Sequence, residues 1–215
     1  MVSADGGKIE ALTTPDKTGR EASHRLPQWL PDGKGLLFTI MKEPFDLQPQ
    51  ITVLDLKSRK WRVLIEDAAD ARYIPTGHLV FVRQGTLMAV PFNLEKEEVT
   101  GQPVPIISNV LQALNIPHLE HNTGAGQFSV SDSGWLVYAE GGIVPEAENS
   151  LVWVDRKGNV QPILVSKAPF FAPRLSPDGQ RFLMLRRQER KPQPVTEMIL
   201  VQNWFEELRR LIPAR

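Results

Sequence analysis

Three aspartates occupy nearly the same place in a recurring turn, and their carboxylates are the groups that could perform acid–base chemistry. They are Asp32, Asp132 and Asp178. General acid–base hydrolysis needs two carboxylates that converge on one substrate. An aspartate near a glycine also suits a tight turn, because its carboxylate accepts a backbone hydrogen bond and glycine tolerates a positive φ. The repetition favours the turn interpretation, so we predict a structural role for these aspartates and no catalytic residue.

Two histidines three residues apart, His118 and His121, are the candidate metal ligands. A zinc site needs at least three protein ligands, and the sequence offers no identifiable third one. Pro117 directly before the pair also disfavours a helix that would place both rings on one face. We therefore predict a polar loop there, with no metal and no cofactor. His24 and His78 are isolated, and we predict that each is a turn or surface residue.

Motifs for other chemistries are absent from the sequence. There is no phosphate-binding loop, no Gly-x-Ser-x-Gly elbow and no His-Arg-Asp kinase loop. The 215 residues include 25 basic and 25 acidic side chains, so a nucleic-acid partner is not expected. No cysteine is present to form a disulfide or a thiolate metal site. The sequence shows no signal-peptide pattern and no apolar run near the ~20 residues of a membrane span, so neither is expected.

The turns recur at a nearly regular interval and define the elements that would position these residues. The closing glycines are Gly33, Gly77, Gly134 and Gly179, which lie 44, 57 and 45 residues apart. An apolar stretch follows each turn, at 36–38, 79–82, 135–138 and 182–185. Self-similarity near this period is typical of β-propeller blades.

The predicted fold is all-β, a propeller of about four four-stranded blades with a short C-terminal helix. The propeller spans residues 1–202, with blades at 23–66, 67–110, 124–166 and 170–202 and a lone strand at 8–14. The last repeat lacks an outer strand of its own. The strand at 8–14 could complete it and close a four-bladed ring, although an open arc of a larger ring fits the same count.

The predicted helix covers residues 203–212 and packs on the propeller. Its apolar residues follow helical spacing, Asn203 is a plausible N-cap, and Glu206 stands where a capping-box partner would. Four tryptophans lie on predicted strands, where we expect core or blade-to-blade packing; an exposed one could instead anchor a partner. They are Trp29, Trp61, Trp135 and Trp153.

The turn sequences resemble those of TolB-like, WD-like β-propellers, on Leu30 to Gly35 and Pro173 to Met184. Residues 75–83, 90–93 and 99–101 look like the propeller region that follows Ser/Thr kinase domains in bacteria, notably acidobacteria. Residues 127–131 and 151–158 resemble its next blade, and 203–208 its C-terminal ending, so the resemblance covers roughly residues 5–212.

This resemblance implies interaction or sensing rather than shared chemistry. Family members usually carry about six blades, often with an upstream kinase or a membrane span, and this sequence shows neither. An extracytoplasmic location is implied when such a propeller is attached to a membrane-anchored kinase. We expect a non-catalytic scaffold for protein or peptide partners. The alternative is a small-ligand or hydrolytic propeller that uses its channel mouth. A third alternative is an open ring whose exposed edges are covered by self-association.

Overall fold

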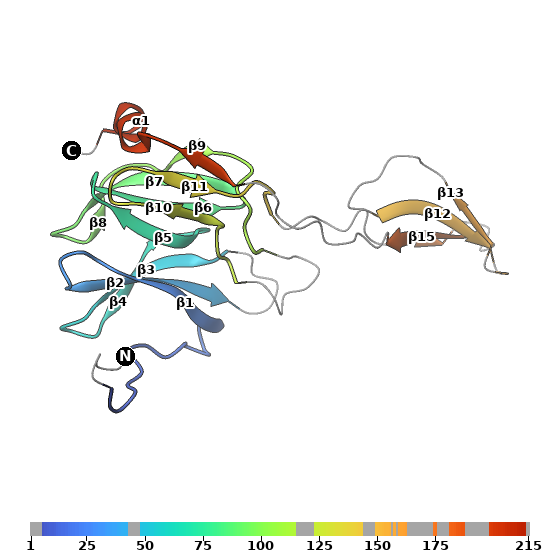
Figure 1. Ribbon diagram of the computed structural model, residues 1–215. Helices are drawn as coiled ribbons and strands as arrows, with labels where there is room; N and C mark the ends of the chain where they lie inside the picture. The colour runs from blue at the N-terminus through green and yellow to red at the C-terminus, as the bar shows by residue number, and fades with distance from the viewer. Residues whose placement is uncertain are drawn as a thin grey trace. The chain divides into compact units, whose positions relative to one another are not determined.

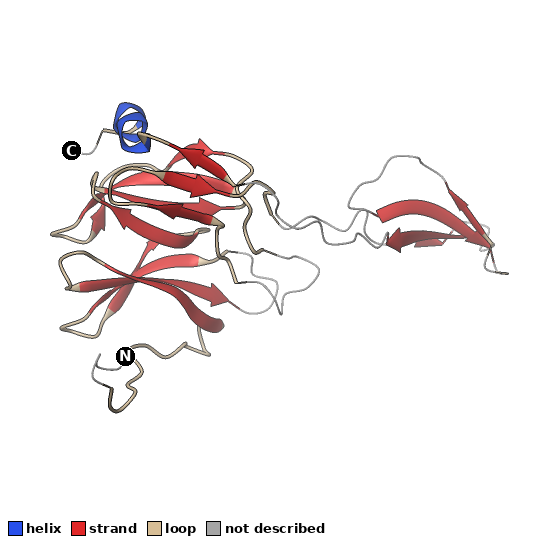
Figure 2. Ribbon diagram, in the orientation of Figure 1, coloured by secondary structure: helices blue, strands red, loops and turns tan. Residues whose placement is uncertain are grey.

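In the residues that it describes, the computed structural model contains β-strands and one helix near the C-terminal end (Figures 1 and 2). It describes residues 6–42, 48–114, 123–143, 149–155, 157, 159–162, 174–175, 181–187 and 198–213. The chain divides into two compact units. One comprises Met1–Val144 with Glu197–Arg215, and the other comprises Pro145–Thr196.

The first sheet is a meander of four antiparallel strands in chain order. They are β1 (Glu21–Trp29), β2 (Gly35–Lys42), β3 (Gln50–Asp55) and β4 (Trp61–Ile65). Leu37 lies opposite Val53, and both point toward the second sheet, whereas Leu36 and Leu54 pair on the other face. The period of two in the sequence therefore sorts side chains onto two faces as expected.

The second sheet repeats this plan with one additional outer strand. It contains β5 (Ala69–Ile74), β6 (His78–Arg83), β7 (Thr86–Asn93), β8 (Glu98–Val99) and β9 (Val104–Ile107), and both β8 and β9 pair with β7. Gln84 and Gly85 connect β6 to β7 with φ of 45° and 73°. Positive φ at both positions is the geometry of a type I′ hairpin, the usual form of a two-residue connection between antiparallel strands.

The third sheet differs from the predicted third blade. It consists of β10 (Phe128–Val130), β11 (Leu136–Tyr138) and β16 (Ile199–Val201). The expected partner of β11 was Leu151–Asp155, but Ile199–Val201 pairs with β11 instead. Either aliphatic strand could pair with β11 as far as the sequence shows. Local alternation determines which side chains share a face of a strand, but it does not determine which strand lies beside it.

The remaining strands form one sheet in the second unit, in the order β13-β12-β15-β14. These strands are β12 (Asn149–Asp155), β13 (Val160–Pro162), β14 (Arg174–Leu175) and β15 (Arg181–Arg187). Strands expected in two different blades, 124–166 and 170–202, are thus paired with each other through β12 and β15.

The N-terminal segment does not form the expected strand at 8–14. Residues 8–14 have no strand structure, and Leu12 packs against the exposed side of the first sheet. Because residues 8–14 form no strand, this segment does not complete the last blade as predicted. Pro15 and the polar residues before it supply few side chains that a sheet could bury.

Helix α1 (Trp204–Leu211) confirms the predicted spacing but not the predicted cap. Trp204, Phe205 and Leu208 are buried in a cluster with residues of the second and third sheets. Asn203 adopts a left-handed conformation and its side chain makes no capping hydrogen bond, so the capping box is wrong. The Trp204 N–H donates instead to the Gly134 carbonyl at 3.0 Å, which fixes the helix start to a turn of the third sheet.

Candidate functional site

The recurring turns have the backbone geometry that glycine accommodates. Gly33, Gly77 and Gly134 have φ of 69°, 79° and 89°, and each N–H donates to the carbonyl three residues earlier. In the first turn, Asp32 Oδ1 accepts a hydrogen bond from the Lys34 N–H at 3.0 Å. The third turn uses a serine instead, since Ser131 Oγ accepts from the Trp135 N–H at 3.0 Å.

The other predicted site residues have different outcomes. Asp132 lies in the exposed part of the third turn, and Asp178, Gly179, His118 and His121 fall outside the described residues. Within the described ranges, no group of three or more His, Cys, Asp or Glu side chains could hold a metal ion. No helix of the described chain is long and apolar enough to cross a membrane.

The two isolated histidines are not surface residues, contrary to the sequence-based prediction. His78 is fully buried at the start of β6, where its Nε2 lies 2.8 Å from the Ile212 carbonyl oxygen and its Nδ1 lies 3.0 Å from Thr76 Oγ1. Because a carbonyl only accepts, Nε2 donates and Nδ1 accepts from the threonine. Burial lowers the pKa of His78, and the nearby Arg209 charge lowers it further.

His24 is also largely buried and joins the N-terminal segment to the first sheet. Its Nδ1 lies 2.8 Å from Thr13 Oγ1, and its Nε2 lies 3.0 Å from Glu21 Oε2. The imidazole packs 4.9 Å from the ring of Phe38 and 5.9 Å from Trp61. Each histidine has one local partner, Thr76 or Glu21, and one more distant partner, the Ile212 carbonyl or Thr13, which the local sequence does not indicate.

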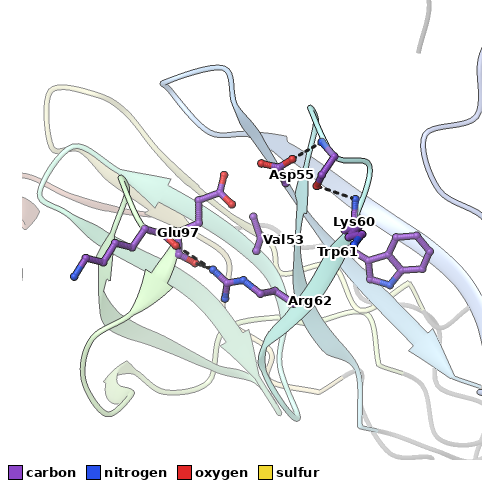
Figure 3. A pocket seen from close by; sticks show the side chains of 8 residues that line it. Val53, Asp55, Lys60, Trp61, Arg62 and Glu97 are labelled. Atoms are coloured by element: carbon purple, nitrogen blue, oxygen red, sulfur yellow. Dashed lines mark hydrogen bonds between the residues drawn. The ribbon is translucent and has the colours of Figure 1, made fainter.

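A hollow of about 340 Å³ opens between the first two sheets, at the edge formed by their β3–β4 and β7–β8 turns. We call it the rim hollow. Its lining residues come from the first sheet and from the turn before β8: Val53, Asp55, Ser58, Lys60, Trp61, Arg62, Lys96 and Glu97. In Figure 3 the Arg62 side chain extends toward Glu97, whereas the indole of Trp61 points away from it.

Arg62 ties the two sheets together at the rim hollow. Its Nη2 donates to the carbonyl oxygens of Lys96 at 3.1 Å and Glu97 at 2.7 Å. The register places Arg62 opposite Val53, on the face of the first sheet that packs against the second. A guanidinium held by two carbonyls is fixed in place before any ligand arrives.

The carboxyl group of Glu97 lies at the rim hollow, close to the backbone of the first sheet. It has φ of 54°, and its side chain lies so close to Gly35 that a Cβ there would collide with the carboxylate. Burial raises the pKa of Glu97, and the charges of Asp55 and Asp32 raise it further against the opposing effect of Arg62 and Lys34. The turn aspartate Asp32 is therefore close enough to influence this site.

Asp55 belongs to a second recurring turn, which sequence reasoning missed. Its Oδ1 accepts from the Ser58 N–H, and bonds from Ser58 lower the pKa of Asp55. Asn93 Oδ1 accepts from the Lys96 N–H at 2.9 Å, and Asp155 Oδ1 from the Asn159 N–H at 2.9 Å. An Asp or Asn at the end of the third apolar strand, before a polar turn, was the available signal.

Three of the strand tryptophans are more exposed than predicted. Trp29, Trp61 and Trp135 expose 53%, 38% and 39% of their surface, so the structure does not bury them as core residues. The side chain of Trp153 lies outside the described part. Among the tryptophans whose side chains the structure describes, the buried one is Trp204, on α1.

Comparisons with known proteins give only distant structural likenesses. No family model and no curated protein matches the sequence. An oligogalacturonate lyase in complex with manganese is 13% identical at a TM-score of 0.42, over 65% of this chain and 36% of that one. TolB from Acinetobacter baumannii is 20% identical at a TM-score of 0.38, over 73% of this chain and 36% of TolB. Regucalcin, a calcium-binding protein from Agrobacterium tumefaciens, is 14% identical at a TM-score of 0.39, over 77% of this chain and 62% of regucalcin.

This chain therefore spans about a third of the length of the lyase and of TolB. At these identities and TM-scores, the likenesses carry no information on activity, ligand or partner. The chemistry of the rim hollow has to be argued from its own residues.

Proposed function

We propose that this chain is a non-catalytic scaffold of β-propeller type that binds protein or peptide partners, with the rim hollow as the contact for an acidic segment. The observation that carries the proposal is Arg62, a cation fixed between two sheets at the mouth of a hollow. The resemblance to kinase-associated propellers agrees with a place in bacterial signalling, in an extracytoplasmic location.

The charges around the rim hollow favour an acidic partner. Lys60, Arg62 and Lys96 are exposed, whereas Asp55 and Glu97 are partly buried. Asp55 is already engaged by Ser58, and the raised pKa of Glu97 reduces its charge relative to an ordinary glutamate at mildly acidic pH. A carboxylate on a partner thus meets three accessible cations, and an exposed patch of one sign steers a partner of the opposite sign.

A peptide library displayed on phage tests this proposal. We expect the selected peptides to be enriched in Asp and Glu and to bind more weakly as salt increases, because exposed charges are screened. Fluorescence polarisation should show about tenfold weaker binding to Arg62→Gln, the loss of roughly one charge-assisted hydrogen bond.

Two further variants make the outcome decisive. Lys96→Gln removes a cation without removing a bond between the sheets, so its binding should also weaken. Arg209→Gln removes an exposed arginine of α1 and should leave binding unchanged. Equal binding of the peptides to wild type, Arg62→Gln and Lys96→Gln would refute the rim hollow as the contact.

A small-ligand or hydrolytic function is the second candidate, and the environment of Glu97 favours it. Carboxyl groups with raised pKa beside other carboxylates cluster at catalytic sites. A screen with p-nitrophenyl esters and glycosides tests it. Turnover that is lost in Glu97→Gln and kept in Glu98→Gln would replace the scaffold proposal with an enzyme.

A further inference from the structure

The first sheet exposes apolar side chains on the face turned away from the second sheet. The register places Trp29 opposite Leu36, Leu36 opposite Leu54, and Leu54 opposite Trp61, so these four side chains form one row across all four strands. Leu12 covers the middle of this face. The two tryptophans at the ends of the row remain 53% and 38% exposed. We call this surface the leading face.

The third sheet exposes a matching surface on the face turned away from the second sheet. Leu200 lies opposite Val137, and Trp135 precedes Val137 by two residues, which places it on the same side. Leu200 is 60% exposed and Trp135 is 39% exposed, and Met198, two residues before Leu200, is 74% exposed. We call this surface the trailing face.

The opposite faces of the same two sheets are already buried inside the first unit. Leu37 and Val53 of the first sheet share a cluster with Leu79 and Phe81 of the second. Val80 and Val82 of the second sheet share another cluster with the third, through the residues Phe128 and Leu136. The second sheet thus lies between the other two. In both contacts, one face of a sheet packs on a face of the sheet that follows it in the chain.

We propose that the trailing face of one copy of this chain packs on the leading face of a second copy. Within the first unit, the leading face of the first sheet and the trailing face of the third sheet are both exposed. Each copy therefore carries both of the surfaces that such a contact needs. Both surfaces present an exposed tryptophan, a residue type enriched at interface hot spots. The net charge of zero means that no long-range repulsion opposes the approach of two copies.

Such a contact is heterologous, because two different surfaces meet. Two copies close on themselves if the rotation between them permits it, and otherwise they extend into longer chains. Trp61 lines the rim hollow and also belongs to the leading face, but Trp29 and Leu200 do not line the hollow. Variants of these two residues therefore test association separately from peptide binding.

Mixing two single variants tests the head-to-tail arrangement. Trp29→Ser damages the leading face and leaves the trailing face intact, and Leu200→Ser does the reverse. We expect wild type to show a mass of at least twice 24.2 kDa by light scattering, and each variant alone to be monomeric at the same concentration. An equimolar mixture should recover dimers, because one intact leading face then meets one intact trailing face.

The control and the contrary outcomes are defined by the same measurement. Leu211→Ser changes an exposed apolar residue of α1 that lies on neither face, and it should associate like wild type. Circular dichroism and thermal unfolding establish that every variant is folded. A wild type that stays monomeric at about 100 μM, where a contact with Kd in the micromolar range would be saturated, overturns the proposal. Association that survives both variants, or variants whose mixture stays monomeric, overturns the head-to-tail arrangement.

Discussion

Two fully buried threonines differ in whether their hydroxyl groups have a partner. Thr39 Oγ1 accepts a hydrogen bond from the Asp70 N–H at 3.0 Å, whereas Thr52 Oγ1 is buried without one. An unsatisfied buried polar group costs about 1–3 kcal/mol. We therefore expect Thr52→Val to raise the free energy of unfolding by about 1 kcal/mol and Thr39→Val to lower it by a similar amount. Urea denaturation measures both, and equal effects of the two substitutions would contradict this account.

The buried imidazole of His78 makes stability depend on pH. Its pKa is lowered in the folded chain, so the unfolded chain binds more protons as the pH falls through the usual value near 6.5. The stability contributed by neutral His78 is complete above that value and is lost as the pH falls toward the lowered pKa. We expect the difference in unfolding free energy between pH 7.5 and pH 5.0 to be smaller in His78→Gln, whose amide can still donate to the Ile212 carbonyl. If the unfolding free energy of His78→Gln changes with pH as much as that of wild type, His78 is not the source of the pH dependence.

Individual residue roles were predictable only where the partner is local in sequence. Asp32 bonds to a backbone N–H two residues away, so turn chemistry suffices to place it. His78, by contrast, bonds to a carbonyl 134 residues away, and Glu97 lies against Gly35 of another sheet. The local sequence pattern does not indicate these contacts, so the rim hollow could not be predicted from the sequence.

At the scale of elements, helix α1 stabilises the first unit through one side only. Leu208 is fully buried in the cluster shared with the second and third sheets, whereas Leu211 is 42% exposed. We expect Leu208→Ala to lower the free energy of unfolding by about 2–5 kcal/mol, the usual cost of emptying a packed leucine site. Leu211→Ala provides the matched control, with a change within about 0.5 kcal/mol. Equal losses for both, measured in urea, would mean that α1 packs differently.

Strands were predicted better than sheets. The apolar stretches after the recurring turns located β2, β6, β11 and β15, because the apolar pattern and the turn residues are both local signals. Which strand joins which sheet depends on contacts between distant segments, and Ile199–Val201 and Leu151–Asp155 carry similar aliphatic patterns. The prediction of the third sheet failed at this step. The predicted strand at 8–14 was also wrong, since Leu12 is partly buried against the first sheet without any strand pairing.

At the scale of the whole molecule, the described core of the first unit contains no residue of the second. The three apolar clusters draw on the first three sheets, α1 and Leu12. The third sheet is completed by β16, which belongs to the first unit. The first unit should therefore fold without residues 145–196, which the repeat pattern alone would not predict, since it assigns Leu151–Asp155 to the third blade.

Replacing residues 145–196 with a short Gly-Ser linker tests this independence. We expect the shortened chain to unfold in one cooperative transition, with a midpoint within about 3 °C of the first unit in the full chain, the shift that ~1 kcal/mol produces at this size. Adding Leu208→Ala to the shortened chain should lower its stability as in the full chain, because both retain the contact of α1 with the third sheet. If the shortened chain loses its β structure by circular dichroism, strand β12 and not β16 completes the third sheet.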